Sequence, residues 1–208
     1  MPVIASCLVI FPAHTSSAVL VFAASWVMML IGRVRIRELL KLLGLAAAGV
    51  VLIVTLNLGR SETAEGRFAT WIHLWTQSQR DKPVENLSDT ERSMIAIHNG
   101  GLLGEGAGQS AMRVEMIHPE SDYAYAFFVE EYGIVLALAL LMLYLWIFFR
   151  AIEIFRRCGT AFPGLLVLGL ALLITCQALL HIMVTVNLIP ETGQTLPLIS
   201  RGGSSVLF

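Results

Sequence analysis

The sequence predicts an all-α polytopic membrane protein, and three observations support this class. Of its 208 residues, 56% are hydrophobic and 14% are charged, with a mean hydropathy of +0.75, values outside the usual range of soluble domains. Apolar runs long enough to cross a bilayer flank one long polar segment, residues 60–122. Basic residues gather in two short connections between these runs. We therefore expect a bundle of about four to five membrane helices.

The apolar runs give the expected order of spans along the chain. A shorter apolar piece, residues 1–14, precedes them and is interrupted at Pro12, without the basic start of a signal peptide. Another apolar run begins at residue 204, so we expect the chain to be truncated at both ends. The expected spans are residues 15–31, 42–59, 123–149 and 158–190.

The distribution of charge predicts the side of the membrane on which each connection lies. Residues 33–41 and 150–157 contain seven of the fourteen Lys and Arg residues. Short basic connections face the cytoplasm in most membrane proteins. The long loop 60–122 contains ten acidic residues and six basic ones, which fits the outer face. We therefore place residues 60–122 and 190–203 outside.

Part of the long loop has the period of an amphipathic helix. Phe68, Trp71, Ile72 and Trp75 recur at helical spacing and form one apolar stripe. Because Trp favours the level of the lipid headgroups, the stripe is typical of a helix lying on the membrane surface. A helix packed on other protein needs the same stripe, so both interpretations stay open. Residues 78–92 are expected to be a solvated loop.

The next stretch carries the polar groups on which any chemistry depends. A flexible, turn-rich segment is predicted by its glycines. Pro119 should break the chain, and Ser121 and Asp122 should open a helix that carries Glu130 and Glu131 on its first turns. A carboxylate is therefore expected where the loop becomes a membrane helix. The glycines of this segment are Gly100, Gly101, Gly104, Gly106 and Gly108.

Several classes of function are not indicated. Cys7, Cys158 and Cys176 lack the spacing of a zinc site or a disulfide framework. The HExxH, GxSxG, Walker and kinase patterns are absent from the sequence. The net charge of -1 gives no reason to expect a nucleic-acid partner.

Three segments of the chain resemble, in the same order, signature segments of the SEDS family of FtsW, RodA and SpoVE proteins. They read GGLLGEGAGQS, HPESDYAYAFFVEEYG and NLIPETGQTLPLISRGGSS. The resemblance covers essentially the whole chain, residues 1–208, as a single membrane domain that corresponds to the C-terminal half of a protein with about ten membrane helices. Two departures stand out. The spacing in Pro119-Glu120-Ser121-Asp122 is tighter than in the family, and Arg201 stands where many members have Tyr.

The resemblance implies a peptidoglycan glycosyltransferase of the bacterial inner membrane. Such an enzyme polymerises lipid II, the undecaprenyl-diphosphate-linked disaccharide pentapeptide, at the outer face. The implied partners are a class B penicillin-binding protein and other membrane proteins of the divisome or elongasome. The motifs favour a role in division, and a role in elongation stays open. The alternatives are a lipid II flippase and a non-catalytic divisome scaffold. No cofactor is certain, and a divalent cation stays open.

The same resemblance assigns roles to individual residues. It places the catalytic base at Asp122, for which an ordinary carboxylate at a helix start is the alternative. Arg113 is the candidate for binding the diphosphate, although arginines in loops are commonly just solvated. Independently of the resemblance, Glu130 and Glu131 are candidates for substrate binding because ionisable groups at membrane depth are costly, and placement at the membrane interface, at the shallow end of the helix, is the alternative. The remaining substrate-binding candidates are Ser200, Gly202, Gly203 and Ser204.

His181 and Gln177 lie four residues apart on the same face of the last predicted span. They fit a polar contact between helices better than the lining of a cavity in the membrane.

Overall fold

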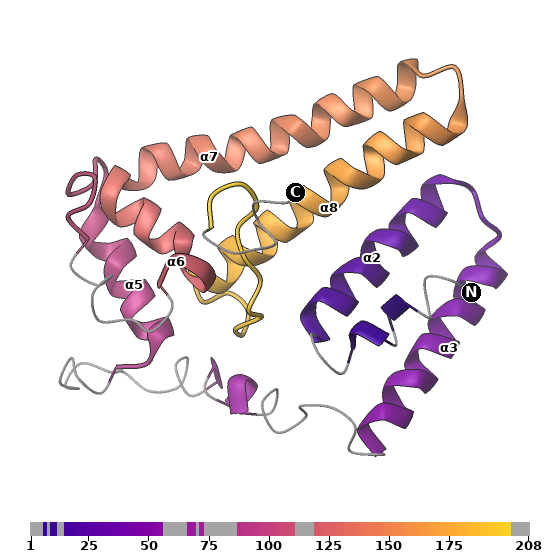
Figure 1. Cartoon of the computed structure of the whole chain (residues 1–208), viewed down its shortest axis with the longest axis horizontal. Coiled ribbons are helices and arrows are strands. Elements are labelled where there is room, and N and C mark those ends of the chain that lie inside the picture. Colours follow the sequence, from indigo (N-terminus) through magenta and orange to yellow (C-terminus); the bar gives the residue numbers. More distant parts are fainter. Residues whose placement is uncertain are drawn as a thin grey trace. The chain divides into compact units, whose positions relative to one another are not determined.

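The computed structural model describes residues 6–7, 9–11, 15–55, 66–69, 71–72, 87–110 and 119–200 (Figure 1). All regular elements of these residues are helices, as predicted. The chain divides into two compact units. Unit 1 comprises residues 1–65 and 147–176, and unit 2 comprises residues 66–146 and 177–208.

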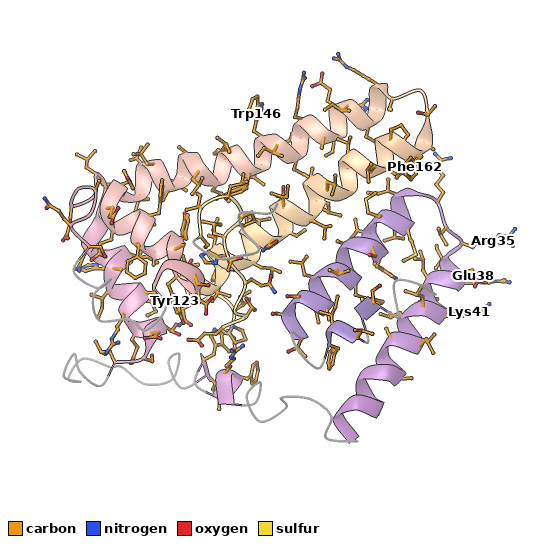
Figure 2. The ribbon with its side chains drawn as sticks, viewed as in Figure 1. Arg35, Glu38, Lys41, Tyr123, Trp146 and Phe162 are labelled. Carbon is orange, nitrogen blue, oxygen red and sulfur yellow. The ribbon has the colours of Figure 1, made fainter. Side chains whose placement is uncertain are left out.

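Unit 1 contains the first two predicted spans. Helix α2, Thr15–Ile31, has no charged residue, and its bounds match the predicted span. Helix α3, Ile36–Thr55, begins six residues earlier than predicted. Its first turns are amphipathic, with Lys41 Nζ 2.9 Å from Glu38 Oε1, so part of the basic connection is itself helical (Figure 2).

The core of unit 1 is apolar. Ala151 packs with Leu168 and Ala171. Helix α7 comprises Ala124–Arg157, and helix α8 comprises Ala161–Thr185. These two helices are the described elements that are long and apolar enough to cross a membrane, while α2 is apolar but shorter. The side chains packed around this core are Met28, Ile147, Phe148, Ile152, Phe155 and Val167.

Unit 2 contains a helix that the sequence analysis missed. Helix α5, Asp89–Gly100, begins inside the segment that we expected to be a solvated loop. Ser88 and Glu91 form a capping box, in which the Ser88 backbone N–H donates to Glu91 Oε2 over 2.7 Å. Thr90, Glu91 and Ser93 are buried, so this helix is packed on protein rather than solvated. The Ser-x-x-Glu pattern of residues 88–91 is the sequence signal from which the start of this helix could have been predicted.

Helix α7 is interrupted at Gly133, whose φ of 81° and ψ of 167° are not helical. The turn that follows α5, residues 101–106, binds the backbone groups that the interruption frees. Glu105 N–H donates to the Glu130 carbonyl over 2.9 Å, and Ile134 N–H donates to the Gly101 carbonyl over 3.0 Å. The interruption therefore leaves these polar groups paired inside the protein, as a break near membrane depth requires.

The glycines of this turn serve close packing. A Cβ atom on Gly104 would lie 2.3 Å from the Glu131 carbonyl oxygen, and one on Gly100 would lie 2.2 Å from that of Val129. Gly104 also has a φ of +79°. The predicted turns are present, and Gly100 and Gly104 in addition allow two backbones to lie in close contact.

Candidate functional site

The carboxylate of Asp122 lies at the junction of two helices. Helix α6, Pro119–Asp122, is a single turn that ends at this residue, and α7 begins at Ala124. Our expectation that Ser121 and Asp122 open the membrane helix is therefore wrong. Proline is well suited to the first position of a helix, so Pro119 starts α6 instead of breaking the chain. The Tyr123 carbonyl accepts the Ala126 N–H over 2.9 Å and begins α7.

The residues on either side of Asp122 are fixed by the last loop of the chain. Ser200 is buried, and its hydroxyl donates to the Ser121 carbonyl over 3.0 Å. The Ser200 hydroxyl oxygen in turn accepts a hydrogen bond of 2.8 Å from the Leu196 N–H. Asp122 is partly exposed, and its Oδ1 atom accepts a hydrogen bond of 3.0 Å from the Ser121 hydroxyl. Ser200, predicted to bind substrate, thus holds the backbone of the Asp122 segment.

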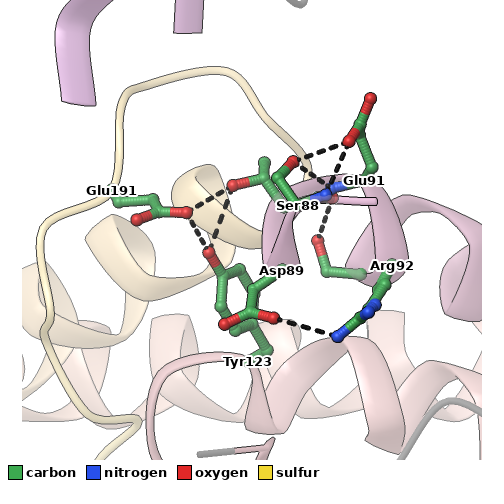
Figure 3. A network of polar contacts seen from close by, with 8 residues as sticks. Ser88, Asp89, Glu91, Arg92, Tyr123 and Glu191 are labelled. Atoms are coloured by element: carbon green, nitrogen blue, oxygen red, sulfur yellow. Dashed lines mark hydrogen bonds and ion pairs between the residues drawn. The ribbon is translucent and has the colours of Figure 1, made fainter. Parts of the chain in front are cut away.

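A second connection reaches the residue after Asp122. The hydroxyls of Tyr123 and Thr90 both donate to Oε1 of Glu191, and the Thr90 contact measures 2.5 Å (Figure 3). Three segments, namely the start of α5, the α6–α7 junction and the last loop, meet at this carboxylate. Burial, and secondarily the bond to Glu191, raises the pKa of the Tyr123 phenol well above its usual value. Tyr123 therefore stays a neutral donor at physiological pH.

His181 and Gln177 hold the last loop against α8. His181 is buried, and its Nδ1 atom lies 2.7 Å from the Gln194 carbonyl, so this nitrogen carries the proton. Its Nε2 atom accepts the Tyr125 N–H over 3.3 Å at the start of α7. Gln177 Nε2 donates to the Thr195 carbonyl over 3.1 Å. The predicted polar contact between helices is confirmed, and it extends to the loop backbone.

Glu130 and Glu131 have different environments. Glu130 is fully buried, and the hydroxyl of Ser110 donates to its Oε2 atom. Its Oε1 atom is buried without a hydrogen-bond partner among the described residues. Glu131 is partly exposed. The structure thus brings Glu130 together with the end of the glycine-rich segment, and leaves Glu131 accessible.

Other predicted residues have more limited outcomes. Arg113, Gly202, Gly203 and Ser204 lie outside the described residues. Trp71 donates from Nε1 to the Asn187 carbonyl over 3.2 Å, which favours packing on protein over the membrane surface at this position. Phe68 and Ile72 are exposed. Within the described part of the chain, no group of three His, Cys, Asp or Glu residues is arranged to bind a metal ion.

A family model described as cell cycle protein, FtsW/RodA/SpoVE, matches residues 1–208. The chain belongs to this family. FtsW/RodA/SpoVE proteins are membrane proteins, and the all-helical structure with its long apolar helices agrees with that class. The resemblance inferred from the three motifs is therefore confirmed.

Curated relatives within the family are named probable peptidoglycan glycosyltransferase FtsW. The protein from Marinobacter nauticus is 34% identical over 206 residues, covering 96% of this chain and 49% of the relative. The protein from Saccharophagus degradans is 30% identical, covering 92% of this chain and 48% of the relative. The chain thus spans about half the length of these two relatives.

The fold also resembles a solved structure. A chain from a structure titled "Structural coordination of polymerization and crosslinking by a peptidoglycan synthase complex" matches with a TM-score of 0.61 at 20% identity. The match covers 95% of this chain and 53% of the other. At this identity, the likeness supports the fold, a polytopic bundle of membrane helices.

Sequence reasoning missed Glu191, the carboxylate that accepts the hydrogen bonds of Thr90 and Tyr123. Its position in a Pro-Glu-Thr-Gly turn gave no chemical signal, because a single acid in an outer loop is usually solvated. Thr90 and Tyr123 were missed for a similar reason. Their hydroxyls gain a role only when the fold brings them to Glu191, which is 101 residues from Thr90 and 68 residues from Tyr123 in the chain.

Proposed function

We propose that the protein is a peptidoglycan glycosyltransferase that polymerises lipid II at the outer face of the bacterial inner membrane. Its relatives are named for this activity. The observation that carries the proposal for this chain is the placement of Asp122. A partly exposed carboxylate stands at the end of α6 while the residues before and after it are tied to the last loop. Such support gives a reactive group a defined position together with access to substrate.

In the proposed reaction, Asp122 acts as general base toward the acceptor sugar hydroxyl. The hydroxyl oxygen forms a bond to the anomeric carbon of the donor sugar as its proton passes to the carboxylate. The bond from that carbon to the diphosphate breaks, and undecaprenyl diphosphate leaves with the electron pair. A positioned general base contributes about 100- to 10,000-fold to the rate.

The surrounding residues have supporting roles in this proposal. Arg113 binds the leaving diphosphate through charge-assisted hydrogen bonds. The partly exposed Glu131 lines the acceptor side, and Glu130, which is fully buried, acts on that side through its contact with Ser110. Gly202, Gly203 and Ser204 contribute to the substrate site next to Ser200. The partner is a class B penicillin-binding protein, and the process is division.

The decisive experiment measures lipid II polymerisation by the purified full-length protein with its partner. Asp122→Asn keeps the shape of the side chain and removes the proton acceptor, so we expect the rate to fall about 100-fold or more. Glu105→Gln is the matched control, because Glu105 is an exposed acid in the nearby turn. It should keep the wild-type rate. If Asp122→Asn polymerises lipid II at the wild-type rate, the assignment of the base is wrong.

The same protein separates the proposal from a flippase. A flippase moves lipid II between leaflets without making glycan. Reconstituted protein that translocates labelled lipid II but forms no polymer, with or without its partner, would overturn the glycosyltransferase assignment. A protein with neither activity that still binds its partner would be a scaffold.

A further inference from the structure

Two neighbouring leucines are highly exposed on the turn of residues 101–106, which is hydrogen-bonded to the backbone of α7 around Gly133. Leu102 is 71% exposed and Leu103 is 86% exposed, the latter being among the most exposed large apolar side chains of the described chain. They form the tip of the turn between α5 and Gly104. A turn in water normally carries polar side chains at such positions. The composition of this tip therefore points to an apolar environment.

The backbone of the turn is already prepared for such an environment. Gly104 N–H donates to the Gly100 carbonyl over 2.7 Å, and Gly106 N–H donates to the Glu131 carbonyl over 3.1 Å. The carbonyls of Gly101 and Leu102 accept the Ile134 and Val135 N–H groups over 3.0 and 3.5 Å. Irregular backbone next to lipid is tolerated only when its polar groups are paired within the protein. This turn meets that condition at the carbonyls of residues 100–102 and at the N–H groups of residues 104–106.

The depth of the tip along α7 is compatible with the hydrocarbon layer. Its carbonyls bind the backbone at Ile134 and Val135, which lie 16 and 15 residues before Arg150, the next charge on α7. At 1.5 Å per residue, Ile134 is about 24 Å from Arg150 along the helix axis. The hydrocarbon layer is about 30 Å thick. A bilayer edge at Arg150 therefore leaves the tip inside the apolar layer.

The segment of α7 to which the turn is hydrogen-bonded is itself apolar. Between Gly133 and Arg150, α7 has no charged side chain, and many of its large side chains are exposed. Trp146 is one of them and is 68% exposed (Figure 2). The other large exposed side chains of this segment are Ile134, Val135, Leu136, Leu138, Met142, Leu143 and Phe149.

We infer that the Leu102–Leu103 tip inserts into the bilayer and contacts the acyl chains of the surrounding phospholipids. The turn is then a short re-entrant element that anchors the end of α5 and the glycine-rich segment at a fixed depth. This contact is separate from the reaction proposed above, since it holds for a polymerase, a flippase or a scaffold.

Spin labelling in the full-length protein tests this inference. Cys7, Cys158 and Cys176 are first replaced by serine, and a nitroxide is then attached at Leu103→Cys in phospholipid nanodiscs. Collision rates with oxygen, which concentrates in lipid, and with a water-soluble nickel chelate are compared. Val135→Cys gives the reference for lipid, and Ala107→Cys, on the exposed part of the same loop, gives the reference for water. Leu102→Cys is measured as a second position.

We expect both leucine positions to give the high oxygen and low nickel collision rates of the Val135 reference. Nickel collision rates equal to those at Ala107 would place the tip in water and overturn the inference. Low collision rates with both reagents would place the tip against protein, and would overturn it equally. Wild-type expression and monodispersity of each variant show that the label has not disturbed folding.

Discussion

Unit 1 and unit 2 differ in what they bury. The core cluster of unit 1 consists of alanine, leucine and other apolar side chains, and its helices α2 and α3 are uninterrupted. Unit 2 contains most of the buried polar side chains of the described chain, among them Glu130, His181 and Ser200. It also contains the interruption at Gly133. In a membrane protein, buried polar groups and irregular backbone are costly, and their concentration in unit 2 supports our proposal that the functional site lies there.

The largest effect is expected from breaking the close backbone contact of unit 2. Gly104→Ala places a Cβ atom 2.3 Å from the Glu131 carbonyl and imposes strain at a φ of +79°. We expect a loss of about 3 kcal/mol or more in the free energy of unfolding. Denaturant titration in detergent measures it. Gly159→Ala is the control, because nothing lies within 4 Å of its added Cβ. Equal stability of the two variants would contradict the packing argument.

A smaller effect is expected from a cavity in the apolar core of unit 1. Leu168 is 3% exposed between Ala151 and Ala171. Leu168→Ala should cost about 2 kcal/mol, at the low end for such changes, because the unfolded state in lipid also surrounds the leucine with apolar groups. The same titration measures this loss, and polymerisation per folded molecule should stay unchanged. A selective loss of activity would show that unit 1 takes part in the reaction.

The polar network of unit 2 should respond in the opposite way. Glu191→Gln weakens the bonds from Tyr123 and Thr90 without emptying the site. We expect kcat for lipid II polymerisation to fall about tenfold, with KM nearly unchanged, because a charge-assisted hydrogen bond is worth about 1.5–3 kcal/mol. This effect presupposes the proposed reaction. Glu153→Gln, an exposed acid of α7, is the control. A lower melting temperature with unchanged kcat would show that Glu191 has only a structural role.

The Tyr123 hydroxyl sets the pH dependence of this network. Because its pKa is raised in the folded protein, its contribution to stability is fully present below about pH 10, the usual value, and is lost only as the pH rises through the higher folded pKa. We therefore expect wild type and Tyr123→Phe to differ in thermal stability by a constant amount between about pH 6 and pH 9. A difference that changes within this range would show that a group of this network titrates there, and would contradict the prediction.

The smallest effect is expected at the surface of unit 1. Lys41 and Glu38 form an ion pair with both side chains largely exposed. Solvent screens such pairs, so Glu38→Gln should change stability by no more than about 0.5 kcal/mol, a change that denaturant titration can bound. A larger loss would mean that this end of α3 contacts another part of the complete protein.

The difference between the units also explains what the sequence made predictable. Long apolar runs predicted helices α2 and α3. Three sequence motifs, which occur in the same order as in the family, predicted the family. Helix α5 was missed even though Ser88 and Glu91 carry a capping signal, because the surrounding polar composition suggested a loop. Asp122 was placed one element too late, because a proline three residues earlier has two opposite meanings, a break or a helix start.

The network at Glu191 lay beyond sequence reasoning for a physical reason. A carboxylate acquires its role from the two hydroxyls that reach it, and those come from segments 33 residues apart in the chain. Local patterns report helices and turns, whereas such pairings depend on how the helices are arranged. The burial of Glu130 against Ser110, which is 20 residues away, was likewise beyond a local pattern.

The interruption at Gly133 gives α7 two rotational phases that one turn holds together. In an unbroken helix, inserting one residue turns everything beyond it by about 100°. Here residues 101–106 bind the backbone on both sides of the glycine, at Glu130 and Glu131 before it and at Ile134 and Val135 after it. The angle between the carboxylates of the first segment and the apolar surface of the second is therefore set by this turn and not by helical continuity.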